Sequence, residues 1–175
     1  LDGSQGELSG TLVREFAVAT QPEGCVMDDQ RQRLFIGEED TAVWALDAGE
    51  NASTEMTRVI GIGGLIEADI EGLAIYQHPQ HPYLVISSQG NDSYVVINAE
   101  PPYQLRGSFR VGLNSALGID GVSETDGLEV TSANLGGQWS QGMLMVQDGR
   151  KRMPEGNQNY KFVPWQSIAD ALQLD

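Results

Sequence analysis

Positive charge is scarce in this sequence of 175 residues. Lys and Arg number 10 against 25 Asp and Glu, which gives a formal net charge of -15 at pH 7. Such a chain repels phosphate backbones and anionic headgroups, so its composition argues against nucleic acid or a membrane surface as an electrostatic partner. The same excess of carboxylates favours the binding of metal cations.

Several classes of protein are excluded by what is missing. The single cysteine, Cys25, cannot form an internal disulfide, and we expect it to be a small buried hydrophobe. No stretch approaches ~18 consecutive apolar residues, so no membrane span is predicted. The opening "LDGSQGELSG" lacks the basic start and apolar core of a signal peptide, which fits a mature or truncated product of a secreted or periplasmic protein. The length predicts a single domain over residues 1–175.

What the sequence does contain is a pattern that occurs three times. Each pass opens with an acidic residue and a glycine before a short apolar strand. A strand that ends in a polar corner follows, and then a third strand rich in Val or aromatic residues. The passes begin at Glu23, Glu71 and Asp126, and a fourth, outer strand follows the first two at residues 57–62 and 103–111.

Four strands in each ~40–50 residues are typical of a β-propeller blade. An antiparallel sandwich with similar hairpins is the alternative, but it does not explain why the acid–glycine pair recurs at the same place. We therefore predict an all-β propeller with about three to three and a half blades in this chain. Residues 11–18 are expected to form an outer strand of a preceding blade, and residues 164–172 a short C-terminal helix. Propellers usually have ~4–8 blades, so the ring is expected to be incomplete.

Acidic residues should gather at one mouth of the propeller channel, because the innermost strand of each blade faces that channel. Uncompensated buried charges cost roughly several kcal/mol each, and no Lys or Arg lies within four positions of five of these acids. Carboxylate oxygens on loops are suitable ligands for Ca²⁺. The alternative role for these acids is to cap turns. The predicted metal ligands are Glu23, Glu39, Asp69, Glu71, Asp120 and Asp126.

Zinc ligands are not indicated. The two histidines, His78 and His81, lie in a Pro-rich stretch, "QHPQHP", and are expected to be solvated turn residues. The sequence also offers no Ser-His-Asp set and no phosphate-binding P-loop. Several Ca²⁺ ions are therefore the predicted cofactor.

The motifs resemble the C-terminal half of the β-propeller phytases, which are alkaline, calcium-dependent enzymes. The resemblance runs from about Gln21 to Leu172, in the same order, through "QPEGCVMDDQRQRLFIGEEDTAVW", "ADIEGLAIY", "YLVISSQGNDSYVVIN", "SETDGLEV" and "NQNYKFVPWQSIADAL". It implies a six-bladed propeller and a 3-phytase-like phosphatase. Such an enzyme hydrolyses phytate (myo-inositol hexakisphosphate) or lower inositol phosphates, with a metal-bridged water as the attacking nucleophile.

The resemblance also implies roles for individual residues. Glu23 in "PEGC", Glu39 in "GEED" and Asp126 in "ETDG" match active-site Ca²⁺ ligands of the family. Asp69 and Glu71 in "DIEG" match the paired ligands of the next blade. These five residues are thus the expected catalytic set, because the ions they hold would activate water and bind phosphate.

This sequence departs from the family beside Asp120. Asp120 in "IDG" matches an Asp at the edge of the site that also serves a stability-linked calcium. After "VQDG" the family usually continues with an acid and an Asn that help to hold this ion, but here Arg150, Lys151 and Arg152 follow. Cationic side chains do not ligate calcium, so the sequence argues against that ion. Three roles remain for the basic residues. They replace the charge of the missing ion, they contact the substrate, or they form a solvated hairpin tip.

Three functions are compatible with the sequence. The leading one is a calcium-dependent phosphomonoesterase acting on phytate. The second is a catalytically silent, calcium-binding half-propeller that assembles with a partner, and the third is another calcium propeller hydrolase such as a lactonase. The phosphate-binding Lys and Arg residues of the family lie in earlier blades that this sequence lacks. We therefore expect association with a missing N-terminal half or with a second copy, and poor turnover without that half.

Overall fold

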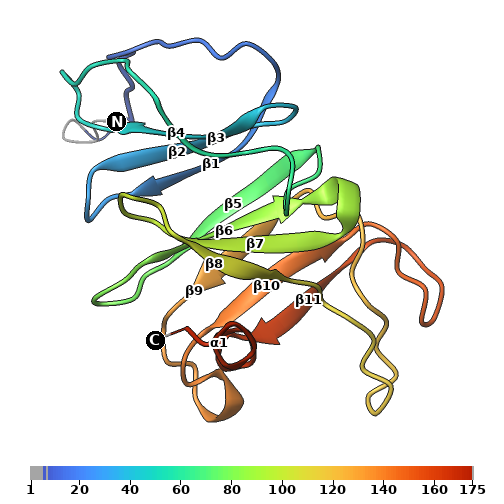
Figure 1. Cartoon of the computed structure of the whole chain (residues 1–175). Coiled ribbons are helices and arrows are strands. Elements are labelled where there is room, and N and C mark those ends of the chain that lie inside the picture. Colours follow the sequence, from blue (N-terminus) through green and yellow to red (C-terminus); the bar gives the residue numbers. More distant parts are fainter. Residues whose placement is uncertain (1–5, 7, 175) are drawn as a thin grey trace.

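A computed structural model describes residue 6 and residues 8–174 (Figure 1). This part of the chain folds into three antiparallel sheets that follow one another along the sequence. One α-helix, α1 (Trp165–Leu172), comes after the last strand, and two short 3-10 helices, η1 (Gln89–Asn91) and η2 (Gly137–Trp139), lie in connections. The predicted all-β architecture with a terminal helix is confirmed. No helix in residues 8–174 has the length and apolar character needed to cross a bilayer.

Each sheet is a meander whose strands run outward in sequence order. The first sheet comprises β1 (Pro22–Asp28), β2 (Arg33–Glu38), β3 (Ala42–Asp47) and β4 (Thr57–Gly61). The second comprises β5 (Ile70–Tyr76), β6 (Tyr83–Ser88), β7 (Ser93–Asn98) and β8 (Leu105–Phe109). The third comprises β9 (Leu128–Thr131), β10 (Met143–Asp148) and β11 (Asn159–Pro164). The three predicted passes therefore correspond to three successive sheets.

The prediction of an outer strand at residues 11–18 is wrong, because these residues form no strand. A strand needs the backbone of a neighbour for its hydrogen-bond ladder, and this segment has none. A side chain attaches it to the first sheet instead. The Arg14 guanidinium donates to the backbone carbonyls of Asp47 at 2.7 Å, Ser53 at 3.0 Å and Ala52 at 3.2 Å.

The second sheet is buried on both faces, which explains the nearly unbroken apolar runs of β5, β6 and β7. Alternate residues of β5 point to opposite faces: Leu73 lies in the core shared with the first sheet, and Ala74 lies in the core shared with the third sheet and α1. On the second side the rings of Tyr76 and Trp165 stack with their centroids 3.8 Å apart. Helix α1 is thus fixed against the sheets by its first residue.

The glycine of the repeated acid–glycine pair allows neighbouring inner strands to touch. A Cβ atom on Gly24 in β1 would lie 2.0 Å from the backbone oxygen of Glu71 in β5. A Cβ on Gly72 would lie 2.9 Å from the backbone oxygen of Asp126 and equally close to the backbone nitrogen of Leu128. Only a residue without a side chain fits at these two contacts.

We expect Gly24→Ala to lower the free energy of unfolding by about 3 kcal/mol, because the new methyl group must displace backbone atoms. Gly127→Ala is the matched control, since no atom lies within 4 Å of a Cβ built on Gly127. The control is expected to change the free energy of unfolding of this chain by less than about 0.5 kcal/mol. Urea denaturation at one calcium concentration measures both variants, and equal midpoints would contradict this packing.

The prediction that Cys25 is buried is wrong, because its side chain is exposed. Within β1 the exposed residues Glu23, Cys25 and Met27 alternate with the more buried Gly24 and Val26. A strand places alternate residues on opposite faces, so Cys25 lies on the face opposite Val26, which packs against the core shared with the second sheet.

Candidate metal centre

The turns of the first and second sheets bring acidic residues to one end of the molecule. Strand β2 ends at Glu38, so Glu39 lies in the turn that leads to β3. Strand β5 begins at Ile70, so Asp69 directly precedes it and Glu71 lies inside it. The Ile70 amide donates to the backbone oxygen of Glu39 at 3.0 Å, which ties the turn to the start of β5. This end lies on the right in Figure 1.

A β-bulge occurs at the acid–glycine pair in two of the sheets. The register between β1 and β2 shifts between Pro22 and Cys25, and the register between β5 and β6 shifts between Ile70 and Leu73. A bulge redirects the side chain of the extra residue and often occurs beside functional sites. The glycine of the recurring pair therefore permits the contact between inner strands. The bulge changes the direction in which the side chain of its acid points.

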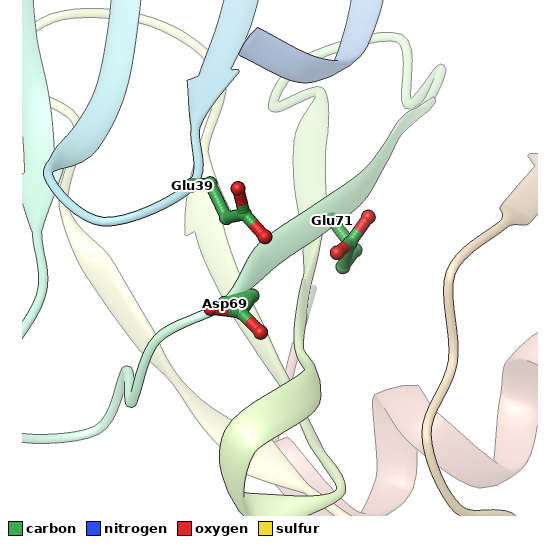
Figure 2. A group of neighbouring side chains, drawn as sticks. All are labelled: Glu39, Asp69 and Glu71. Atoms are coloured by element: carbon green, nitrogen blue, oxygen red, sulfur yellow. The ribbon is translucent and has the colours of Figure 1, made fainter. Parts of the chain in front are cut away.

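Three of the six predicted ligands form a tight cluster. One carboxylate oxygen from each of Glu39, Asp69 and Glu71 lies within 4.8 Å of the other two, and all three side chains are half-buried. Figure 2 shows them gathered around the beginning of β5, with Glu39 contributed by the β2–β3 turn. Residues 32 positions apart in the sequence thus meet at one point, as the propeller interpretation predicts.

Glu23 and Asp126 lie next to this cluster. A shallow groove of about 350 Å³ is lined by corresponding residues of the three inner strands: Glu23, Gly24, Cys25, Glu71, Gly72, Leu73, Asp126, Gly127 and Leu128. Glu71 belongs to both the groove and the cluster. Five of the six predicted ligands therefore lie together, with the other four around Glu71.

The proximity of these acids raises the pKa of two of them. Burial and the nearby charges of Glu23, Asp126, Glu39 and Asp69 raise the pKa of Glu71 from its ordinary value of 4.5 to about 7. Burial, together with the charges of neighbouring carboxylates, also raises the pKa of Glu39. Every charged group that contributes to these shifts is another carboxylate, so the positive charge that the cluster requires does not come from these neighbours.

We expect the metal-free protein to lose stability as the pH rises from about 5 to about 7. The Glu71 carboxyl titrates near 4.5 when unfolded and near 7 when folded, so between these values the folded state binds more protons. Stability that depends on a raised carboxyl pKa is present at lower pH and is lost as the pH rises toward 7. Urea midpoints measured in EGTA across this range check the slope.

Glu71→Gln is the control for this titration, because it removes the ionisable group and should flatten the slope. Asp120, whose pKa is lowered to about 2, contributes no slope in this range. A metal-free midpoint that changes equally with pH in the wild type and in Glu71→Gln would show that repulsion at Glu71 is not a determinant of stability.

The structure does not bring Asp120 into the cluster. Its carboxylate contacts the ammonium of Lys161 at 2.9 Å and accepts hydrogen bonds from the backbone amides of Arg152 and, at 3.2 Å, Met153. These donors lower the pKa of Asp120 to about 2. Lys161 is itself buried, and it also contacts Asp148 and donates to the Gly121 carbonyl at 2.7 Å. Asp120 therefore already has a cation from the chain itself.

Two glutamines that the sequence interpretation missed hold Asp126 in place. Gln89 Nε2 donates to Asp126 Oδ1 at 2.6 Å, and Gln147 Oε1 accepts from the Asp126 amide at 2.9 Å. The motif "ISSQGN" gave no signal for this role, because a neutral amide at a strand corner is common. The contact of Gln89 with Asp126 joins two neighbouring blades, so it depends on how those blades pack.

The chemistry of the clustered donors fits a hard cation. All three are carboxylates, which suit Ca²⁺ or Mg²⁺ better than zinc. The histidines lie elsewhere: His78 Nδ1 accepts from the amides of Gln80 and His81 within their own turn, as expected of turn residues. The site can thus bind a divalent cation through oxygen and present it to an anionic ligand.

Comparison with known proteins identifies the family. The model of the phytase family matches residues 1–175. The chain belongs to the phytase family. It is 38% identical over 177 residues to a 3-phytase of Bacillus subtilis (strain 168). This alignment covers 98% of the chain but 46% of the relative, so the chain spans about half the length of that curated protein.

Membership in the phytase family confirms the resemblance inferred from the motifs. The three sheets are accordingly blades of a phytase-type β-propeller, and the 46% share of the relative fits the expected half. The acidic cluster of this phytase-family chain is made by its first two blades, and the groove beside it extends to the third.

Proposed function

We propose that this chain supplies the carboxylate part of a calcium-dependent site that hydrolyses phytate, a phosphoric monoester. The observation that carries the proposal is the arrangement of four carboxylates around Glu71, whose pKa is raised by burial and by other carboxylates alone. Family membership supports the reaction class, and the 3-phytase name of the Bacillus relative supports phytate as the substrate. An active site for a polyanion that is lined by acids requires a cation.

Calcium fits these donors better than magnesium does. Ca²⁺ accepts ~6–8 oxygens in irregular geometry, whereas Mg²⁺ requires nearly octahedral geometry at shorter distances. Glu39 comes from a turn, Asp69 from the residue before β5 and Glu71 from the bulged part of that strand, which is an irregular set of positions. Bound calcium would attract phosphate oxygens and lower the pKa of the attacking water.

The residues of the chain have distinct functions in this proposal. Glu39, Asp69 and Glu71 bind the cation and, in its absence, repel phytate. Asp126 extends the site toward the third blade, and the Gln89 amide fixes the direction of its carboxylate. Asp120 is assigned no part, because Lys161 and two backbone amides already occupy its carboxylate.

Phosphate release from phytate by the intact protein tests the proposed function. With Ca²⁺ present we expect release, and with excess EGTA we expect none. Mg²⁺ in place of Ca²⁺ should restore little activity. Calcium binding without phosphate release at any calcium concentration would refute the enzymatic proposal and favour a silent calcium-binding propeller.

We further propose that other blades cover the outer face of the third sheet, supplied by additional polypeptide or by a second copy of the chain. This face is apolar: Tyr160 and Phe162 on β11 are 60% and 53% exposed. Such a patch favours association. Light scattering on the purified 175-residue chain should therefore show a mass above 19.0 kDa, and a stable monomer of that mass would contradict the proposal.

A further inference from the structure

A short basic segment stands out in this acidic chain. Arg150, Lys151 and Arg152 are the only adjacent cationic residues in the sequence, and they represent three of its 10 Lys and Arg. They lie in the connection between β10 and β11, residues 149–158, which we call the basic hairpin.

Buried carboxylates hold the backbone of the basic hairpin. The amide of Arg150 donates to Asp148 Oδ1 at 3.3 Å, and the amides of Arg152 and Met153 donate to Asp120 Oδ2. Asp148 and Asp120 are both buried, and both contact Lys161. The hairpin is therefore anchored from beneath, which fixes the place where its side chains reach the surface.

The cationic side chains line a hollow. The hollow has a volume of about 500 Å³ and is lined by Arg150, Lys151, Arg152, Glu155 and Gly156. Lys151 Nζ contacts the carbonyl of Pro154, and Arg150 pairs with Glu124. The exposed Arg152 side chain has no hydrogen bond or ion pair with any residue that the structure describes. Glu155 lines the hollow and Glu124 pairs with Arg150, so three cations face two carboxylates and the hollow keeps a net positive charge.

The basic hairpin lies at the same end of the blades as the acidic cluster. In the third sheet Val146 near the end of β10 pairs with Leu128 at the start of β9, so the hairpin and Asp126 share one end of this sheet. Arg150 pairs with Glu124, only two residues before Asp126. Figure 1 shows the β10–β11 connection on the same side of the molecule as the β2–β3 turn and the start of β5.

We propose that the basic hairpin binds a peripheral phosphate of a polyphosphorylated substrate while another phosphate occupies the acidic cluster. This inference rests on the proposed function. Guanidinium and ammonium groups form charge-assisted hydrogen bonds with phosphate, and Arg offers two donors to one phosphate. A chain of net charge -15 repels a polyanion over most of its surface, so a local cationic hollow at the rim selects the side from which that polyanion binds.

Arg152→Gln and the double variant Lys151→Gln/Arg152→Gln test this assignment in the intact protein with Ca²⁺ present. Arg150 is kept, because its ion pair with Glu124 also holds the loop before Asp126. Arg58→Gln on β4 is the matched control, since it removes the same charge from an exposed arginine at the other end of the first sheet. Each variant is assayed with phytate and with an aryl monophosphate, which has no peripheral phosphate.

We expect Arg152→Gln to raise the KM for phytate about fivefold and the double variant to raise it further, with kcat within about twofold of wild type. The KM for the monophosphate should remain close to that of wild type in every variant. Calorimetric titration of phytate gives an independent reading, in which the double variant should weaken binding and lower its sensitivity to salt.

Two results would overturn the assignment. One is a KM for phytate that changes no more in the double variant than in Arg58→Gln, and the other is an equal change for phytate and the monophosphate. A wild-type protein that releases phosphate from the monophosphate but neither binds nor hydrolyses phytate would instead refute the proposed phytase function. The two failures are therefore separable.

Discussion

Replacing Glu71 by Gln, or Asp69 by Asn, is expected to lower the turnover of phytate by the intact protein by about 100-fold or more. Each change keeps the size of the side chain but removes one negative ligand from the cluster with Glu39. Weaker cation binding then leaves the phosphate and the attacking water without positive charge. The fold should remain intact, because the substitutions remove repulsion among acids that raise the pKa of Glu71.

Phosphate release measured over a range of Ca²⁺ concentrations checks this expectation. Glu50→Gln is the matched control, because it removes one charge from an exposed loop residue beyond β3 and should retain wild-type turnover. If Asp69→Asn and Glu71→Gln both release phosphate as wild type does at every Ca²⁺ concentration, these residues are not ligands of the reactive ions.

Removal of calcium is expected to have the second-largest effect. Excess EGTA should lower the Tm by about 10 °C, because an ion that binds only the folded state contributes about 4 kcal/mol at a thousandfold excess over its Kd. Added Ca²⁺ should restore the Tm, and Mg²⁺ should restore it less well. The physical reason is the mutual repulsion of Glu39, Asp69 and Glu71, which a bound cation relieves when the carboxylates are ionised.

The variant Glu39→Gln/Asp69→Asn/Glu71→Gln is the control for chelation. It lacks the charges that bind the ion, so its Tm should be nearly the same with EGTA and with Ca²⁺. In the wild type, a melting curve that is identical in chelator and in calcium would remove the support for a structural metal at this site.

The blades could be predicted from the sequence because their information is local and repeated. The acid–glycine pair recurs at the start of each inner strand. The period-two burial of β1 and the continuous burial of β5 and β6 follow from the positions of these strands in the stack. The placement of Glu39 beside Asp69 and Glu71 could also be predicted, since a strand that ends at Glu38 returns the chain to the rim where β5 begins.

The remaining features depend on contacts between distant residues, which local patterns do not reveal. No Lys or Arg lies within four positions of Asp120 in the sequence, yet Lys161 on β11 forms an ion pair with it. Residues 11–18 have strand-like composition but no neighbouring backbone to pair with. Gln89 supports Asp126 through a hydrogen bond between the second and third blades, so its role depends on how these blades pack together.

A crystal structure of the protein grown with Ca²⁺ tests the central claim most directly. Anomalous scattering identifies the ion, and we predict calcium within about 2.3–2.6 Å of carboxylate oxygens from Glu39, Asp69 and Glu71. An ordered site at saturating calcium that contains no ion, or a calcium held only by other residues, would contradict it.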